Sequence, residues 1–553
     1  MRVQAIDHVA LLPLYLAAGA AVLALFTGRF AKACMMSGLS AAAIAAMWVG
    51  AGADRSTFAV GTWHSFVADD AAMGAAALFA GLSVLVAAVS GRQSNEYWFL
   101  LAVSAAGGVT LAGSRDLITL IVALETLTVP LYALVAWPRP EGSGAGAATK
   151  PGGMSAEPGR AGTDRVSAAA ARSNRDGAEA GVTFLIASIA SSATALMGAA
   201  LLYAAAGTVH LEGLAAGLAG ADPALAAAGA ALLLGGFAFK LAAAPLHAWA
   251  PLVLERAPLP IATYLASASK LGGAVAIVWA VHFALGAGAG TSTGIVVAAL
   301  SVASIVIGNL GALVQRRTVP LLAWSGIAHA GYTLAPLAVV ATAAGREDAA
   351  AAASAALAYA VFFVLMEAGV FAALTATRTT FGSDEYRWMR AAFGSGERRT
   401  PLGGLKTGGP QGSDLKASAG NARVHVSGGD GPGEGGAIAE LAGMWRSAPL
   451  AGSLFLFSVI GLAGLPPALA GTFAKVVVLE VLASSALWLA VIVAAGAVLG
   501  LAYYLPLART VLLGRGRPMP KGRFAIALAA IGLALLAVTL APQLVLDFTS
   551  VSR

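Results

Sequence analysis

Charged residues are scarce in this chain. Asp, Glu, Lys and Arg make up 11% of its 553 residues, whereas a soluble protein of this length carries about a quarter. Hydrophobic residues make up 58%, and apolar runs long enough to cross roughly 30 Å of hydrocarbon recur from end to end. Water is therefore excluded as the solvent for most of the surface, and the composition predicts an all-α, polytopic membrane protein.

Cysteine is almost absent. The one cysteine, Cys34, lies inside an apolar run, where a small buried hydrophobe is expected. A single thiol excludes an internal disulfide and a cysteine cage for zinc or an iron–sulfur cluster. The sequence also lacks metal-ligand spacing, a nucleophile elbow, a dinucleotide fingerprint and a phosphate-binding loop. We therefore expect no metal, no redox cofactor and no soluble-enzyme chemistry in this chain.

About fourteen apolar runs have the length of membrane-spanning helices. They cover 8–27, 31–52, 70–90, 97–113, 117–137, 181–206, 224–249, 259–286, 292–315, 318–342, 350–377, 447–483, 485–513 and 522–547. Segments 138–178 and 378–437 contain few large apolar residues and cannot offset the entropy of ordering. We expect both to be disordered cytoplasmic insertions. They separate helices one to five (1–137), six to eleven (179–377) and twelve to fourteen (438–553).

The 34 Lys and Arg residues are distributed unevenly between the two sides of the membrane. If the helices alternate in direction, the loops after odd-numbered helices hold 26, the opposite side holds five, and three lie within helices. This asymmetry follows the positive-inside rule and predicts basic loops in the cytoplasm and both termini outside. It also explains the net charge of +7 without a nucleic-acid partner. The first apolar run lacks a small-residue cleavage site, so we expect it to be retained.

Two of the predicted helices are interrupted by proline. Pro245 follows Lys240 in FAFKLAAAPLHAWAP, and Pro466 and Pro467 precede Lys475 in GLAGLPPALAGTFAK. Proline removes a backbone donor, and within a membrane the freed backbone groups are tolerated only where protein or water satisfies them. One broken helix in each half of the chain indicates an inverted repeat with an ion path between its members.

Ionisable residues lie within the predicted helices. Glu125, Lys240 and Lys270 lie at depths of roughly 15 Å, and Lys475 follows the second break. Each such charge costs about 2.5–3.5 kcal/mol on insertion scales. A structural salt bridge or a polar contact between helices accounts for any one of them alone. Together they favour a water-linked proton relay, in which a buried lysine releases its proton when its carboxylate partner moves away.

Three further residues are weaker relay candidates. His329, in WSGIAHAGYTL, either extends the relay or is a satisfied core histidine. His247, two residues after Pro245, lies where the cytoplasmic mouth is expected. Glu367 has no partner evident from the sequence, and it is either an added relay group or the partner of a lysine.

These residues and their surroundings resemble a known family, the antiporter-like proton-pumping subunits of respiratory complex I, the NADH–quinone oxidoreductase. Within that family the N type is the most similar. The matching stretches are ALETLTVPLYALVA (123–136), GFAFKLAAAPLHAWAPLVLERAPLPIATYLASASKLGG (236–273), GNLGALVQRRTVPLLAWSGIAHAGY (308–332), IAELAGMWRSAP (438–449) and GLAGLPPALAGTFAK (461–475). The resemblance covers nearly the whole chain apart from the two insertions and the ends.

The resemblance implies a fourteen-helix fold with two inverted five-helix repeats in a bacterial cytoplasmic membrane. Glu125 then corresponds to the glutamate of the fifth helix, Lys240 to the lysine of the broken helix, and Lys270 to the lysine of the next helix. Lys475 corresponds to the lysine of the second broken helix, which is a glutamate in the M type. The resemblance also implies other membrane-arm subunits as partners, and it assigns NADH, FMN, iron–sulfur clusters and quinone to them.

The sequence departs from the family pattern at several positions. Thr183 stands where a lysine is usual, Leu252 where an aspartate is usual, and Val319–Pro320 where a basic pair is usual. Two alternatives to a proton-translocating membrane-arm subunit therefore stay open. One is a subunit of a multisubunit sodium/proton antiporter or membrane-bound hydrogenase, and the other is a non-pumping structural subunit of the same fold.

Overall fold

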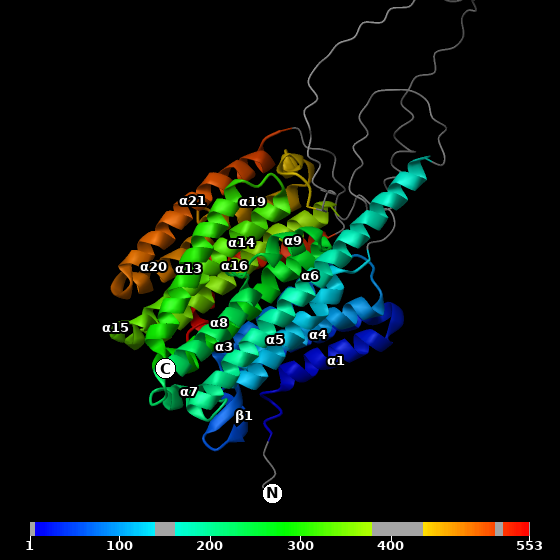
Figure 1. Ribbon diagram of the computed structural model, residues 1–553. Helices are drawn as coiled ribbons and strands as arrows, with labels where there is room; N and C mark the ends of the chain where they lie inside the picture. The colour runs from blue at the N-terminus through cyan, green and yellow to red at the C-terminus, as the bar shows by residue number, and fades with distance from the viewer. Residues whose placement is uncertain (1–5, 139–160, 379–434, 515–523, 552–553) are drawn as a thin grey trace, which may run out of the picture.

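A computed structural model describes residues 6–138, 161–378, 435–514 and 524–551 of the chain. Within these residues, nearly all elements are helices that run side by side in one bundle (Figure 1). Nine helical stretches of the described chain are long and apolar enough to cross a membrane, and three shorter apolar helices accompany them. The prediction of an all-α polytopic membrane protein is confirmed, whereas the count of fourteen helices and the two inverted repeats stay predictions.

The elements form three groups along the chain, and the third group covers the described stretches 435–514 and 524–551. The first contains α1 (Leu12–Phe26), a 3-10 turn (Gly28–Phe30), α2 (Ala31–Gly50), β1 (Arg55–Val60), β2 (Trp63–Ala68), α3 (Asp70–Val89), α4 (Asn95–Gly113) and α5 (Leu117–Val135). The second contains α6 (Ala161–Ala206), α7 (Leu211–Leu218), α8 (Pro223–Leu241), α9 (Trp249–Arg256), α10 (Leu259–Tyr264), a π-helical turn (Leu265–Ser269), α11 (Lys270–Ala280), a second π-helical turn (Val281–Leu285), α12 (Gly286–Gly288), α13 (Gly290–Leu313), α14 (Thr318–Leu334), a 3-10 helix (Ala335–Ala341), α15 (Ala343–Glu347) and α16 (Ala349–Arg378). The third contains a 3-10 helix (Ile438–Leu441), α18 (Met444–Ser447), α19 (Pro449–Ala463), α20 (Ala470–Ser485), α21 (Leu487–Leu512), α22 (Ala525–Leu540) and α23 (Gln543–Phe548).

Both predicted helix breaks are present. Helix α8 ends where Ala242 adopts a left-handed backbone conformation with φ 60°, and Pro245 follows in the turn before α9. Helix α19 ends where Gly464 has φ 78°, and Pro466 and Pro467 separate it from α20. The twelfth predicted helix is therefore two helices, because proline cannot continue the backbone hydrogen bonds.

Helix α6 begins inside the first predicted insertion. Residues 161–178 are helical and continue into the membrane-spanning part of α6, so the predicted boundary at 178 is corrected to the start of this helix. The segment around 167–172 is rich in alanine, the residue with the highest helix propensity. The remaining part of that insertion, 139–160, and residues 379–434 of the second lie outside the described residues.

The β-hairpin was missed by the sequence analysis. Strands β1 and β2 pair antiparallel, with Arg55 opposite Ala68 and Val60 opposite Trp63. The signal was two short runs with β-branched and aromatic residues, RSTFAV and WHSFVA, on either side of a two-residue turn at Gly61, which is typical of a hairpin. It lies at the end of the bundle where the sequence predicts the outer side (Figure 1).

Helix α16 forms the centre of the bundle. Its most apolar 18-residue window is entirely buried, whereas only about a third of the corresponding windows of α6 and α13 is buried. Helices α10, α11, α14, α19, α20 and α22 all contact α16. A charged side chain in the middle of α16 is therefore shielded from both lipid and water by neighbouring helices.

Candidate functional site

Glu125 and Lys240 form an ion pair between helices α5 and α8. The Lys240 Nζ atom lies 3.0 Å from Glu125 Oε1. Lys240 is in the last turn of α8, immediately before the break, and its side chain is 2% exposed. The Glu125 side chain is 27% exposed, because it lies toward the outer face of α5. The pair thus joins a broken helix to an outer face of the described bundle.

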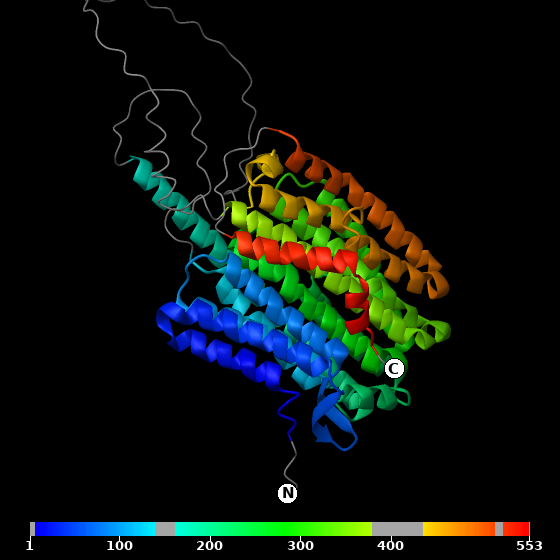
Figure 2. The ribbon, with the colours of Figure 1, turned by 180° about the vertical axis from the view of Figure 1, so that it is seen from behind.

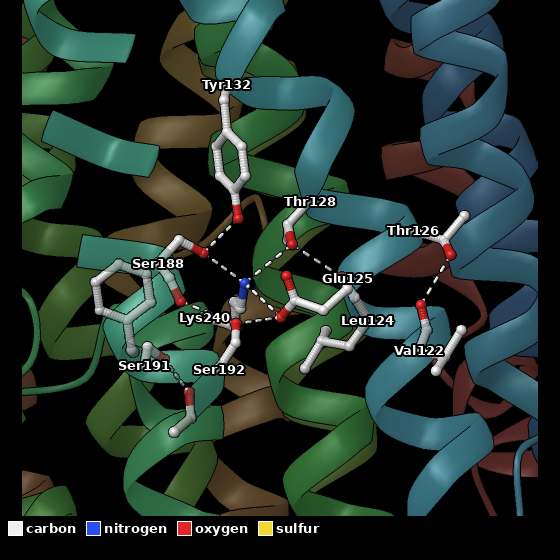
Figure 3. Close-up of polar contacts among 12 residues, drawn as sticks. Val122, Leu124, Glu125, Thr126, Thr128, Tyr132, Ser188, Ser191, Ser192 and Lys240 are labelled. Carbon is white, nitrogen blue, oxygen red and sulfur yellow. Dashed lines mark hydrogen bonds and ion pairs between the residues drawn. The ribbon is translucent and has the colours of Figure 1, made fainter. Parts of the chain in front are cut away.

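A group of hydroxyl side chains surrounds this pair (Figure 3). Lys240 Nζ donates to Thr128 Oγ1 at 2.9 Å and to Ser188 Oγ at 2.6 Å. An ammonium group has three N–H donors, and Glu125, Thr128 and Ser188 provide three acceptors. Ser192 Oγ donates to Glu125 Oε1, and the Tyr132 hydroxyl donates to Ser188 Oγ. Because hydroxyl groups both donate and accept, they can pass a proton along a hydrogen-bonded chain.

The sequence analysis did not single out these hydroxyl groups. A signal was nevertheless present in α5, where Thr128 and Tyr132 follow Glu125 by three and seven residues and so share its face. In α6, Ser188 and Ser192 are four residues apart on one face. Helix α6 therefore contributes serine hydroxyls to this site. Thr183, the position where the family pattern has lysine, is half-buried and hydrogen-bonds only within α6.

Lys270 and Glu367 form a second ion pair, between α11 and α16. The Lys270 Nζ atom lies 3.0 Å from Glu367 Oε2, and both side chains are 1% exposed. Of the two roles that the sequence left open for Glu367, the geometry supports that of a lysine partner. Lys270 begins α11 directly after the π-helical turn, a feature that is frequent at functional sites. Among the described residues, Glu367 Oε1 is buried and has no hydrogen-bond partner.

The two ion pairs lie on helices that touch each other. A Cβ atom placed on Gly273, one turn after Lys270, would lie 2.5 Å from the backbone nitrogen of Leu241. Glycine at this position therefore lets the backbone of α11 approach α8 next to Lys240. The contact places the second lysine on the inner side of the first, toward the centre of the bundle.

Gly326 of α14 provides the space for the second ion pair. A Cβ atom at this position would lie 2.0 Å from Lys270 Nζ and 2.8 Å from Glu367 Oε1. We expect Gly326→Ala to displace the ammonium group from its carboxylate and to reduce proton transport, with the protein still folded. The measurement is proton uptake by vesicles containing the purified complex. Gly532→Ala is the matched control, because a Cβ there meets nothing within 4 Å, and equal uptake by both variants would contradict the expectation.

His329 connects the second ion pair to the C-terminal helices. Its Nδ1 atom lies 2.8 Å from the Tyr359 hydroxyl and its Nε2 atom 3.1 Å from the Tyr504 hydroxyl. The imidazole ring stacks on Phe363 with centroids 4.7 Å apart, and Lys270 Nζ lies 5.1 Å from the centre of the same Phe363 ring. His329 thus has hydrogen-bonding groups on both ring nitrogens, as a group that passes protons requires.

Lys475 lies after the second break, in α20. Its Nζ atom donates to the carbonyl oxygen of Leu462 at 2.9 Å, near the C-terminal end of α19, where the helix dipole favours a cation. Within the described parts of the chain Lys475 forms no ion pair. The helices that carry the candidate relay residues are neighbours: α5 and α8 contact α11, and α11, α14 and α20 contact α16. The residues on them are Glu125, Lys240, Lys270, His329, Lys475 and Glu367.

His247 does not join this series in the described structure. It lies in the turn between α8 and α9, with its ring centroid 5.2 Å from that of Trp324. Across the four described stretches, no group of three or more His, Cys, Asp or Glu side chains is arranged to hold a metal ion.

The fold and the buried lysine–carboxylate pairs define an antiporter-like membrane protein. Residues 168–392 match the family model described as the NADH:quinone oxidoreductase/Mrp antiporter transmembrane region. The chain is 42% identical over 523 residues to NADH-quinone oxidoreductase subunit N of Salinispora tropica, which covers 91% of this chain and 84% of that protein. The chain belongs to the NADH-quinone oxidoreductase subunit N family.

Solved structures show the same fold. A chain of respiratory complex I from Thermus thermophilus superposes with a TM-score of 0.69 at 25% identity, covering 97% of this chain and 98% of that one. A chain of the Mrp complex from Dietzia superposes with a TM-score of 0.67 at 20% identity, covering 98% of this chain and 96% of that one. The second likeness concerns the fold alone.

Proposed function

We propose that this chain is a proton-translocating membrane-arm subunit of an NADH–quinone oxidoreductase, in which quinone reduction by partner subunits drives proton transport. The observation that carries the proposal is the Glu125–Lys240 ion pair, with its 3.0 Å contact next to a broken helix. One acid and one base in contact beside a broken helix, with hydroxyl groups as neighbours, form a site that can hold and release a proton.

The relative position of Glu125 and Lys240 controls the first step. While the two are in contact, the carboxylate stabilises the ammonium group and Lys240 keeps its proton. When Glu125 moves away, an unpaired ammonium costs about 2.5–3.5 kcal/mol at this depth. The proton then passes to the next basic group of the relay. Thr128 and Ser188 are placed to take part in this transfer, because a hydroxyl group can donate its own proton as it accepts another. Helix motion that alters one contact is enough to change the charge of the lysine.

The proton continues toward the second half of the bundle. Lys270, paired with Glu367, is the next group, because α11 touches α8 beside the first lysine. His329 follows, with tyrosine hydroxyl groups on both ring nitrogens. Lys475 is the last lysine of the series and lies beside the second break. Each group in this order has a hydrogen-bond partner on a different helix.

Other membrane-arm subunits are the partners of this chain. The outer face of α5 carries Glu125 between exposed apolar residues, with Val122 58% and Val129 53% exposed. A partly exposed carboxylate facing lipid is costly, so a neighbouring subunit on this face accounts for its position. NADH, FMN, iron–sulfur clusters and quinone belong to partner subunits, and this chain contributes proton transfer rather than redox chemistry.

Copurification distinguishes this function from that of a sodium/proton antiporter subunit. The 42% identity to an oxidoreductase subunit favours the first. We expect an affinity tag on this chain, purified from the native membrane, to recover NADH-dependent quinone reductase activity together with the subunits that carry it. Recovery of a complex without that activity, containing only antiporter-like subunits, would contradict the proposal.

The topology follows from the distribution of basic residues. Reporter fusions after Arg317 and within 139–160 are expected to read cytoplasmic, and fusions near Asp54 and Asp222 external, because the basic loops lie after odd-numbered helices. Paired alkaline phosphatase and fluorescent protein fusions at each position are the measurement. A cytoplasmic reading at Asp222 together with an external reading at Arg317 would reverse the assigned orientation.

A further inference from the structure

A groove on the back of the bundle is lined by α2, α3, α16 and α22. Figure 2 shows α22, in red, beside the blue N-terminal helices, and α22 contacts α3. The groove has a volume of about 650 Å³, within the range of roughly 300–1,000 Å³ that is usual for small-molecule sites. Its described walls are apolar apart from one charged residue, Lys32. No residue of the proposed proton relay lines it.

The groove extends over the thickness of one leaflet of the membrane. Along α3 its lining runs from Ala77 to Ala88, which at the rise of an α-helix spans about 17 Å. Along α22 it runs from Phe524 to Ala534, a stretch of about 15 Å. Half of a hydrocarbon core is also about 15 Å. An acyl chain from one leaflet therefore has the length of this groove.

The positive charge lies at the interfacial end of the groove. Lys32 Nζ donates to the carbonyl oxygen of Ser90 at 2.9 Å, just after Ala88 at the end of α3. The same atom lies 5.3 Å from the Trp98 ring centre, and tryptophan is enriched at the level of the lipid headgroups. This is the end at which Arg29 and Arg92 also lie in the sequence. An anionic headgroup at this end would be attracted by Lys32.

We propose that this groove is a binding site for an anionic phospholipid of the cytoplasmic leaflet, with an acyl chain between α3 and α22 and the headgroup phosphate near Lys32. The apolar lining, the one-leaflet length and the lysine at the interfacial end of the described lining together match this ligand. Leu365 of α16 forms part of the groove, so the bound chain lies against the central helix.

Gly81 provides a selective way to close the groove. It lies on α3 within the lining, and a Cβ atom there meets nothing within 4 Å. Gly81→Leu is therefore expected to fill the groove without displacing protein atoms. Gly532→Leu is the matched control, because Gly532 in α22 is equally unobstructed but does not line the groove.

The test is photo-labelling of the purified complex in vesicles of phosphatidylcholine that contain a trace of phosphatidylglycerol with a diazirine in its acyl chain. We expect peptides of α3 and α22 to be labelled in the wild type and in Gly532→Leu, and at least several-fold less in Gly81→Leu. Unlabelled phosphatidylglycerol should compete about fivefold better than phosphatidylcholine, a preference that one cation near the surface provides, and Lys32→Gln should abolish this preference.

Three results would overturn the proposal. The first is equal labelling of α3 and α22 in Gly81→Leu and the wild type. The second is a wild-type complex in which these peptides are not labelled, especially if Gly81→Leu releases a neighbouring subunit, because that subunit would then fill the groove. The third is an unchanged preference for phosphatidylglycerol in Lys32→Gln.

Discussion

Removing one partner of the Lys270–Glu367 ion pair is expected to destabilise the protein by about 3–5 kcal/mol, the usual cost of leaving a buried charge uncompensated. Both side chains are 1% exposed, so water cannot hydrate the remaining charge. Lys270→Met and Glu367→Gln keep the approximate shapes of the side chains, and each removes one charge. The measurement is the temperature at which the purified complex loses its structure, compared with that of the wild type.

The double variant separates a structural role from a relay role. With both charges removed, most of the lost stability should return, because effects of contacting residues are not additive. Proton transport should not return, because the site no longer holds an ionisable group. Recovery of both stability and transport would show that the pair is only structural. Single variants as stable as the wild type would contradict the buried pairing itself.

Lys240→Ala is expected to abolish the proton transport that this subunit contributes, while the complex remains assembled. The stability cost should be smaller than at the second pair, because Glu125 is 27% exposed and keeps access to polar surroundings. Proton uptake per electron pair in reconstituted vesicles is the measurement, with the amount of assembled complex determined separately.

Thr126→Val is the control for disturbance of α5. Thr126 follows Glu125 directly, but it is half-buried and its hydroxyl donates only to the Val122 carbonyl oxygen (Figure 3). The Thr126→Val variant should therefore transport protons like the wild type. If Lys240→Ala transports as many protons as Thr126→Val, Lys240 is not part of the relay.

The fold class and the positions of the intramembrane charges were predictable from the sequence, because both depend on local features. Apolar runs of sufficient length set the helices, and Pro245 and Pro467 set the breaks. The start of α6 was not predictable from the scarcity of large apolar residues, because alanine forms helices without contributing much hydrophobicity. The hairpin was not evident from the apolar runs, because β1 and β2 are only six residues each.

The partners of the charges were less predictable, because they come from distant parts of the chain. Glu367 is 97 residues from Lys270, and its partner depends on how α16 packs against α11. The hydroxyl groups of Ser188 and Ser192 are common residue types in membrane helices, so only their contacts with Lys240 and Glu125 identify them. Sequence analysis thus identified the charged groups, and the packing of the helices identified their neighbours.

The charge of Glu125 is the central element of the proposed mechanism, and Glu125→Gln tests it most directly. Glutamine keeps the shape of the side chain and its hydrogen bonding with Ser192, but it removes the charge that holds the Lys240 proton in place. The measurement is proton uptake per electron pair in vesicles containing equal amounts of assembled complex. The proposed mechanism predicts a clear fall in this ratio, and a ratio equal to that of the wild type would contradict it.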